Sequence, residues 1–123
     1  MTRSTFREGG GFEEAAAYSR AVRIGAHVAV SGTAARGGGG AYEQAREALE
    51  RALVAANELG AAREDVLRTR LLLTGGCDWE AAVRAHREAF AGIDPANTTY
   101  FVAGFIPDDV LVEVELDAFV PPR

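Results

Sequence analysis

The C-terminal segment alternates strictly between apolar and acidic residues, and this pattern restricts the fold more than any other. Val112, Val114, Leu116 and Ala118 fall on one side, and Leu111, Glu113, Glu115 and Asp117 fall on the other. Successive side chains of a β-strand point to opposite faces, so residues 110–120 predict a strand with one buried face and one face rich in carboxylates. A sheet that contains such a strand has one covered face and one open face.

Periodicity and turn residues predict the other elements. They are a short strand near residues 2–8, a hairpin over 18–30 that turns at Gly25 and Ala26, a mobile loop over 34–40, an amphipathic helix over 41–59, a strand over 66–74, a helix from Asp78 to near Gly92, and a strand over 97–105. The predicted order is β-β-β-α-β-α-β-β. We therefore expect an α+β fold in which both helices cover one face of the sheet.

The strand over 66–74 has two unlike faces. Leu67, Thr69, Leu71 and Leu73 are predicted to face the helices, and Arg68, Arg70 and Leu72 the open side. If this strand lies beside the C-terminal strand, its arginines form cross-strand pairs with the carboxylates. Two interpretations are open: the open face is a solvated surface of ion pairs, or other subunits cover it.

Composition excludes several classes of function. The 123 residues suit one domain, residues 1–123, and 18 acidic side chains outnumber 13 basic ones, all of them arginine. The acidic balance disfavours nucleic-acid binding, and the absence of lysine excludes Schiff-base catalysis. A single cysteine, Cys77, cannot form an internal disulfide. No stretch suits a membrane span or a signal peptide, so we expect a cytoplasmic protein without a membrane partner.

A series of short motifs runs in order through nearly the whole chain. They are Tyr18-Ser19-Arg20-Ala21-Val22 with Gly25, Val30-Ser31-Gly32, Gly60, Asp65-Val66, Leu73-Thr74, Phe90, Pro95-Ala96, Pro107 and Val112-Glu113-Val114-Glu115. In this order and spacing they resemble the RidA/YjgF family of imine and enamine deaminases, also called L-PSP endoribonucleases. The resemblance implies a chorismate-mutase-like six-stranded sheet with two helices on one face. It also implies a homotrimer whose sheets form a barrel, with ligand pockets in the clefts between subunits.

The resemblance implies that the pocket is lined by residues from several motifs. Glu113 is the candidate catalytic residue. The candidate ligand-binding residues are Tyr18, Ser31, Gly32, Phe90, Asn97 and Thr99, together with Arg70 from the strand over 66–74. Phe90 also suits the core, because it and Trp79 fall on the inward face of the second predicted helix. Tyr18 suits either a pocket wall or a subunit interface.

The chain departs from the family at Asn97. Members with deaminase activity carry an arginine directly after the Pro-Ala pair, and its guanidinium grips the substrate carboxylate, whereas Pro95-Ala96 is followed here by Asn97. A neutral amide offers two donors and no charge, so losing a charged hydrogen bond of about 1.5–3 kcal/mol weakens carboxylate binding roughly ten- to a hundredfold. The chain thus looks like a branch without this arginine, in which Arg68 or Arg70 could take its place. Thr99 stands where many members carry a cysteine.

Glu113 has two interpretations. Imine hydrolysis needs a base to orient water, and a carboxylate in a partly dry cleft is suited to that role. Alternatively, Glu113 forms an ion pair with Arg68 or Arg70. Asn97 likewise either donates to a neutral carbonyl or caps the entry of its strand.

Three functions remain open. They are hydrolysis of imines, enamines or related reactive metabolites; non-catalytic binding of a metabolite by the trimer; and tailoring of a neutral carbonyl substrate. Ribonuclease activity is disfavoured by the acidic balance and by the lack of a paired-histidine or lysine centre. His27 and His86 stand alone, without further ligands at metal spacing, so we expect neither a metal nor a cofactor.

Overall fold

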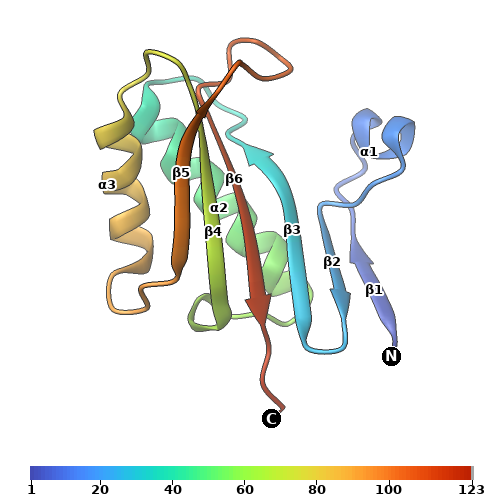
Figure 1. Ribbon diagram of the computed structural model, residues 1–123. Helices are drawn as coiled ribbons and strands as arrows, with labels where there is room; N and C mark the ends of the chain where they lie inside the picture. The colour runs from blue at the N-terminus through green and yellow to red at the C-terminus, as the bar shows by residue number, and fades with distance from the viewer. Residues whose placement is uncertain (123) are drawn as a thin grey trace.

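The computed structural model describes residues 1–122, which form a six-stranded mixed sheet with helices packed on one face (Figure 1). The elements in chain order are β1 (Arg3–Phe6), α1 (Gly11–Ala16), β2 (Ala21–Ile24), β3 (His27–Ala34), α2 (Ala41–Glu58), a 3₁₀ turn (Arg63–Asp65), β4 (Val66–Thr74), α3 (Trp79–Phe90), β5 (Ala96–Val102) and β6 (Val112–Phe119). The sheet order is β1-β2-β3-β6-β4-β5, and only β4 and β5 run parallel. The predicted α+β fold is confirmed, and the short helix α1 is an addition that the sequence analysis did not predict.

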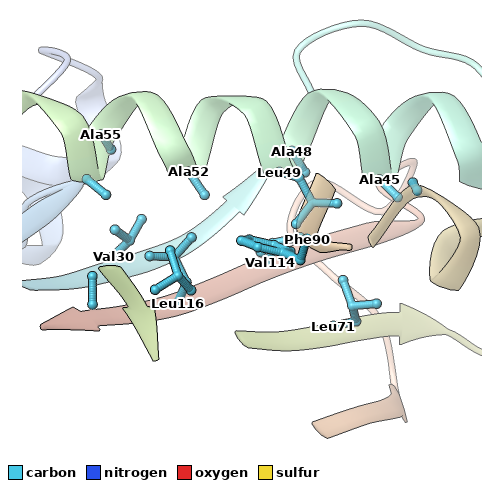
Figure 2. Close-up of a cluster of buried hydrophobic side chains, with 14 of the residues drawn as sticks. Val30, Ala45, Ala48, Leu49, Ala52, Ala55, Leu71, Phe90, Val114 and Leu116 are labelled. Atoms are coloured by element: carbon cyan, nitrogen blue, oxygen red, sulfur yellow. The ribbon is translucent and has the colours of Figure 1, made fainter. Parts of the chain in front are cut away.

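The core lies between the sheet and the two long helices. Alanines at helical spacing along α2 face the sheet, with Leu49 among them, and Figure 2 shows this row above Val30, Val114 and Leu116. Ala45, Ala48 and Ala52 are completely buried, which lets the helix backbone approach the strands closely. Phe90 at the end of α3 fills the space between the helices and the sheet.

Strand β6 has the two unlike faces that its alternation predicts. Val112, Val114, Leu116 and Ala118 are all fully buried against the helices. Glu113, Glu115 and Asp117 are partly exposed on the face that no long helix covers in Figure 1. The same strand therefore completes the core and carries a row of carboxylates on the open face.

The prediction for β4 was wrong at one position. Thr69, Leu71 and Leu73 are buried as expected, but Leu67 is 61% exposed. The pairing with β6 shifts between Val66 and Arg68, so Val66 takes the inward place and Leu67 turns outward. Strict period-two counting fails across such an irregularity.

Two further predictions need correction on the α3 and β5 side. Trp79 was expected in the core, but it is 50% exposed at the start of α3, directly after the N-cap Asp78. Strand β5 was expected to continue to residue 105, but it ends at Val102. There it pairs with Thr74, the last residue of β4, and has no further strand to follow.

The turn of the predicted hairpin lies where expected. Ile24 pairs with His27, so Gly25 and Ala26 form a two-residue connection between β2 and β3. Gly25 has a φ of 61°, a conformation that favours glycine. The glycine-rich loop before α2 is attached to that helix, because the carboxylate of Glu47 accepts the backbone N–H groups of Arg36 and Gly37 at 2.6 and 3.2 Å.

Candidate functional site

A β-bulge in β3 creates the main polar feature of the open face. From Val30 to Thr33 the strand β3 advances three residues while its partner β6 advances two, from Leu116 to Val114. Val30 and Thr33 both point into the core, so the two residues between them, Ser31 and Gly32, are left on the open side. A bulge adds one residue to a strand and redirects its neighbours, as it does here.

A groove of about 580 Å³ runs along this bulge, and we call it the open-face groove. Its lining comes from β2, β3, β6 and the segment before β2: Tyr18, Arg20, Val22, Ala29, Val30, Ser31, Gly32, Glu113, Glu115 and Asp117. Four of the residues predicted for the site, Tyr18, Ser31, Gly32 and Glu113, therefore lie together within one chain.

Glu113 lies directly against Gly32. A Cβ atom placed on Gly32 would be only 2.6 Å from Glu113 Oε1, so the carboxylate occupies the space that any larger residue would need. Burial raises the pKa of the Glu113 carboxyl; the Arg20 guanidinium lowers it, and the neighbouring Glu115 raises it. Among residues 1–122 the Glu113 carboxylate has no hydrogen bond or ion pair, so it is available to a ligand or to water.

The predicted ion pair of Glu113 with Arg68 or Arg70 is not formed. Glu113 stands opposite Leu72 on β4, whereas Arg70 stands opposite Glu115. Arg70 Nη1 lies 3.5 Å from Glu115 Oε1, which confirms a cross-strand pair between these two strands. Arg68 instead donates to Thr98 Oγ1 on β5 at 3.2 Å. Both arginines are engaged by their neighbours, and neither lines the open-face groove.

Arg20 is a residue of the groove that the sequence analysis missed. Its Nη1 donates to the carbonyl oxygen of Gly32 at 3.1 Å and to Thr33 Oγ1 at 3.5 Å. Its guanidinium carbon lies 5.3 Å from the centre of the Tyr18 ring. Arg20 lies between Ser19 and Ala21, which are both buried, so alternation along an extended chain places the Arg20 side chain on the open face.

Ser31 shapes the groove, but its donors are already used within the chain. Its backbone N–H donates to the Arg20 carbonyl at 2.9 Å, and its hydroxyl donates to the Ser19 carbonyl at 2.6 Å. These two bonds fix the bulge against the segment before β2. Ser31 therefore positions the wall of the groove, whereas the resemblance implied that it binds the ligand.

Asn97 and Thr99 lie elsewhere, on the helix-facing side of the edge strand β5. Thr99 Oγ1 donates to Asn97 Oδ1 at 2.8 Å, and Asn97 Nδ2 donates to Thr69 Oγ1 at 3.0 Å. Thr69 is fully buried, and its hydroxyl oxygen lies 2.7 Å from His86 Nε2 on α3. Burial lowers the pKa of His86, which favours the neutral ring that can accept the Thr69 proton. This chain of bonds holds the Asn97 amide in one orientation.

Phe90 does not belong to the groove. It is 2% exposed on the helix side of the sheet, where its ring centre lies 4.9 Å from that of His86. The structure therefore supports the core interpretation of Phe90 and not its place in the candidate site.

The helix side carries another hollow, of about 480 Å³, between α2 and α3. Its floor contains Leu49, Leu53 and Ala85, and charged residues such as Arg46 and Glu88 contribute to its lining. None of the residues predicted for the site lines this hollow, whereas four of them line the open-face groove, so the groove is the better candidate for chemistry. Among residues 1–122 no three His, Cys, Asp or Glu side chains gather in a way that could hold a metal ion. None of the helices in this part of the chain is both long and apolar enough to cross a bilayer.

The architecture defines the class of protein. A six-stranded mixed sheet with two long helices on one face is the chorismate-mutase-like α+β fold. The family model described as endoribonuclease L-PSP matches residues 11–120, and the chain belongs to this family, which is also the YjgF/RidA family.

Similar proteins come from several bacteria. An uncharacterized protein of Streptomyces coelicolor, SCO2049, is 40% identical over 119 residues, which cover 92% of this chain and 89% of that protein. The crystal structure of Rv2704 from Mycobacterium tuberculosis, a member of the YjgF/YER057c/UK114 family, is 39% identical with a TM-score of 0.92, covering 97% of this chain and all of that one. The YjgF family member NMB1025 of Neisseria meningitidis, at 22% identity and a TM-score of 0.83, covers 100% of this chain and 98% of its own, and shows the fold alone.

Proposed function

We propose that this protein is a homotrimer whose inter-subunit clefts bind a small metabolite, and that Glu113 orients water for the hydrolysis of an imine or enamine. The observation that carries the proposal is the division of the site between two separate places in one chain. Tyr18, Gly32 and Glu113 line the open-face groove, while Asn97 and Thr99 lie at the β5 edge on the opposite side of the sheet.

These two places cannot meet within one subunit. Strands β3 and β5 are separated by β6 and β4, which amounts to about 14 Å at the usual strand spacing, and the side chains point to opposite faces. The edge strand β5 also exposes Tyr100 and Phe101, at 41% and 54%. An edge strand with exposed aromatic residues is suited to contact with another chain. A neighbouring subunit that brings its β5 edge to the open-face groove would complete the site.

Glu113 has the properties that water activation requires. Its carboxylate has no partner among residues 1–122, and it is half-buried with a pKa raised by that burial. A base works best when its pKa lies near the operating pH. In the proposed reaction water adds to the imine carbon while Glu113 takes a proton from it and passes that proton to the imine nitrogen, which gives a carbinolamine. The hydroxyl proton of the carbinolamine then moves through Glu113 to the amine as the C–N bond breaks, which releases a carbonyl compound and ammonia and leaves Glu113 as a carboxylate.

Two measurements test the proposal. Sedimentation or light scattering should give three times the 13.0 kDa chain mass. Imines generated in situ by an amino-acid oxidase should release keto acid faster with the protein than in buffer, and Glu113→Ala should abolish the difference. The control Glu80→Gln changes an exposed glutamate on α3 and should leave the rate intact.

The outcomes distinguish the candidate functions. A trimer without any acceleration across several amino acids would contradict the hydrolase and leave metabolite binding, which calorimetry with small carbonyl compounds then measures. A monomer in solution would remove the shared cleft and with it both functions. Selective binding of neutral carbonyl compounds without hydrolysis would favour a tailoring enzyme in which Asn97 contacts the carbonyl.

A further inference from the structure

The open-face groove presents one unengaged guanidinium edge beside one unengaged carboxylate. Arg20 uses Nη1 for Gly32 and Thr33, and its Nε and Nη2 groups have no acceptor among residues 1–122. No carboxylate in this part of the chain lies close enough to Arg20 to form an ion pair. An arginine that keeps several donors free in a groove is equipped to receive an anion.

The other two carboxylates of the groove each lie beside a basic side chain of a neighbouring strand. Glu115 is paired with Arg70 at 3.5 Å, and Asp117 lies 3.6 Å from His27 Nε2. Within residues 1–122, Arg20 and Glu113 are therefore the two charged groups of the groove that have no oppositely charged side chain within ion-pair distance. Both touch Gly32, the first through its carbonyl oxygen and the second at the position of the missing Cβ. Gly32 thus lies between the Arg20 guanidinium and the Glu113 carboxylate, and because it has no side chain it leaves both groups accessible to a ligand.

The Arg20 head is held in place before any ligand arrives. Its bonds to Gly32 and Thr33 fix one edge of the guanidinium, and the Tyr18 ring lies against it at 5.3 Å. A planar guanidinium fixed at one edge can offer two parallel N–H groups from another edge to a carboxylate. Little side-chain entropy is then lost on binding.

We infer that Arg20 is the residue of this site that binds the carboxylate of a small ligand, so that the reactive carbon of the ligand lies toward Glu113. The inference rests on the proposed function, because it names the anion-binding residue of the same groove. It places the anion on the segment before β2, whereas Asn97 at the β5 edge offers only a neutral amide.

The test compares an acid with its uncharged analogue. Binding of 2-oxobutanoate and of 2-oxobutanamide is measured by calorimetry on the wild type, Arg20→Gln, Arg20→Lys and the control Arg46→Gln, which changes an exposed arginine on α2. The wild type should bind the acid roughly ten- to a hundredfold more tightly than the amide. Arg20→Gln should remove this preference, because its affinity for the acid should fall while its affinity for the amide stays unchanged. Arg20→Lys should keep part of it, and Arg46→Gln all of it.

The results separate this inference from the proposed function. If the wild type binds acid and amide equally, or if Arg20→Gln keeps the preference, Arg20 is not the anion site while ligand binding by the groove stands. If neither probe binds the wild type and no imine is hydrolysed, both proposals fail. If Arg20→Gln loses its fold or its oligomeric mass, Arg20→Lys decides. A folded Arg20→Lys protein that keeps only part of the preference for the acid supports the inference, because lysine keeps the charge and loses the two parallel N–H groups. A folded Arg20→Lys protein with the same preference as Arg46→Gln overturns it. Equal weakening of acid and amide in that folded variant overturns the inference.

Discussion

Replacing Gly32 with alanine should lower the activity of the open-face groove while leaving the stability of the protein nearly unchanged. The new Cβ would lie 2.6 Å from Glu113 Oε1, and ordinary van der Waals contact begins at 3.4 Å, so the carboxylate must move by about 0.8 Å. A misplacement of about 1 Å at a reacting group can cost roughly a hundredfold in rate. We therefore expect Gly32→Ala to lower imine hydrolysis about a hundredfold.

The same substitution should change stability little. Gly32 does not have a positive φ, so alanine can adopt its backbone conformation, and fewer unfolded conformations contribute about 0.4–1 kcal/mol in favour of the fold. The atom that must move is the end of a flexible side chain, which shifts at low cost. Loss of activity should therefore come with a melting temperature within about 5 °C of the wild type.

Three readouts decide this prediction. Initial rates of keto-acid release report the chemistry, thermal unfolding reports the stability, and NMR titration of the Glu113 carboxyl reports its environment without any need for activity. Burial raises the pKa of Glu113, so a carboxylate pushed toward solvent should titrate at a lower pH than in the wild type. Gly38→Ala is the control, because a Cβ there meets nothing within 4 Å. A Gly32→Ala protein with wild-type rate and wild-type Glu113 titration would refute the reasoning.

Three other substitutions test the packing and charges around the site. Thr69→Val should lower the free energy of unfolding, measured in denaturant, by about 2 kcal/mol, because it removes the buried hydroxyl that His86 and Asn97 share. The control Thr98→Val, at an exposed position of β5, should change it by less than about 0.5 kcal/mol. Glu113→Gln should raise the free energy of unfolding at neutral pH, because burial raises the pKa of Glu113 and makes its charged form costly in the fold. The extra stability of the variant should grow as pH rises from the ordinary carboxyl pKa through the raised one. A stability difference that does not change with pH would contradict this prediction. Leu116→Ala should lower the free energy of unfolding by about 2–5 kcal/mol in the same unfolding curves, since Leu116 is fully buried where β6 packs against α2. A change below about 1 kcal/mol would show that the core around Leu116 is less tightly packed than the structure indicates.

The fold was predictable where one rule governed a whole element. The alternation along β6 and the alanine spacing along α2 each continue without interruption, so the buried faces followed from counting. The errors lie where the count is broken locally. Leu67 turns outward at a register shift, and α1 is only six residues long, too short to show a period.

The candidate site was predictable in part for a different reason. The motif residues Tyr18, Gly32 and Glu113 are far apart in sequence, and the fold brings them to one groove. What the sequence did not reveal is the bulge that turns Ser31 and Gly32 outward together, since an extra residue in one strand leaves no mark in hydropathy. The clearest alternation of arginines is that of β4, and those arginines are engaged by Glu115 and Thr98, whereas Arg20 lies outside any strand and shows no such pattern.

The division of the polar residues between two faces gives a physical reason for sharing a site between subunits. On the open face, Glu113 and Arg20 keep charged groups unengaged in a shallow groove, where water competes with any ligand. At the β5 edge, Asn97 is held by Thr69 and Thr99 and offers a ligand only a neutral amide. Either half alone is a weak site. A second chain placed over the groove would exclude water from the charged half and supply an oriented neutral amide from the other half. That burial would strengthen the attraction between Arg20 and an anion. It would also add to the burial that already raises the pKa of Glu113, toward the range in which a carboxylate acts as a base.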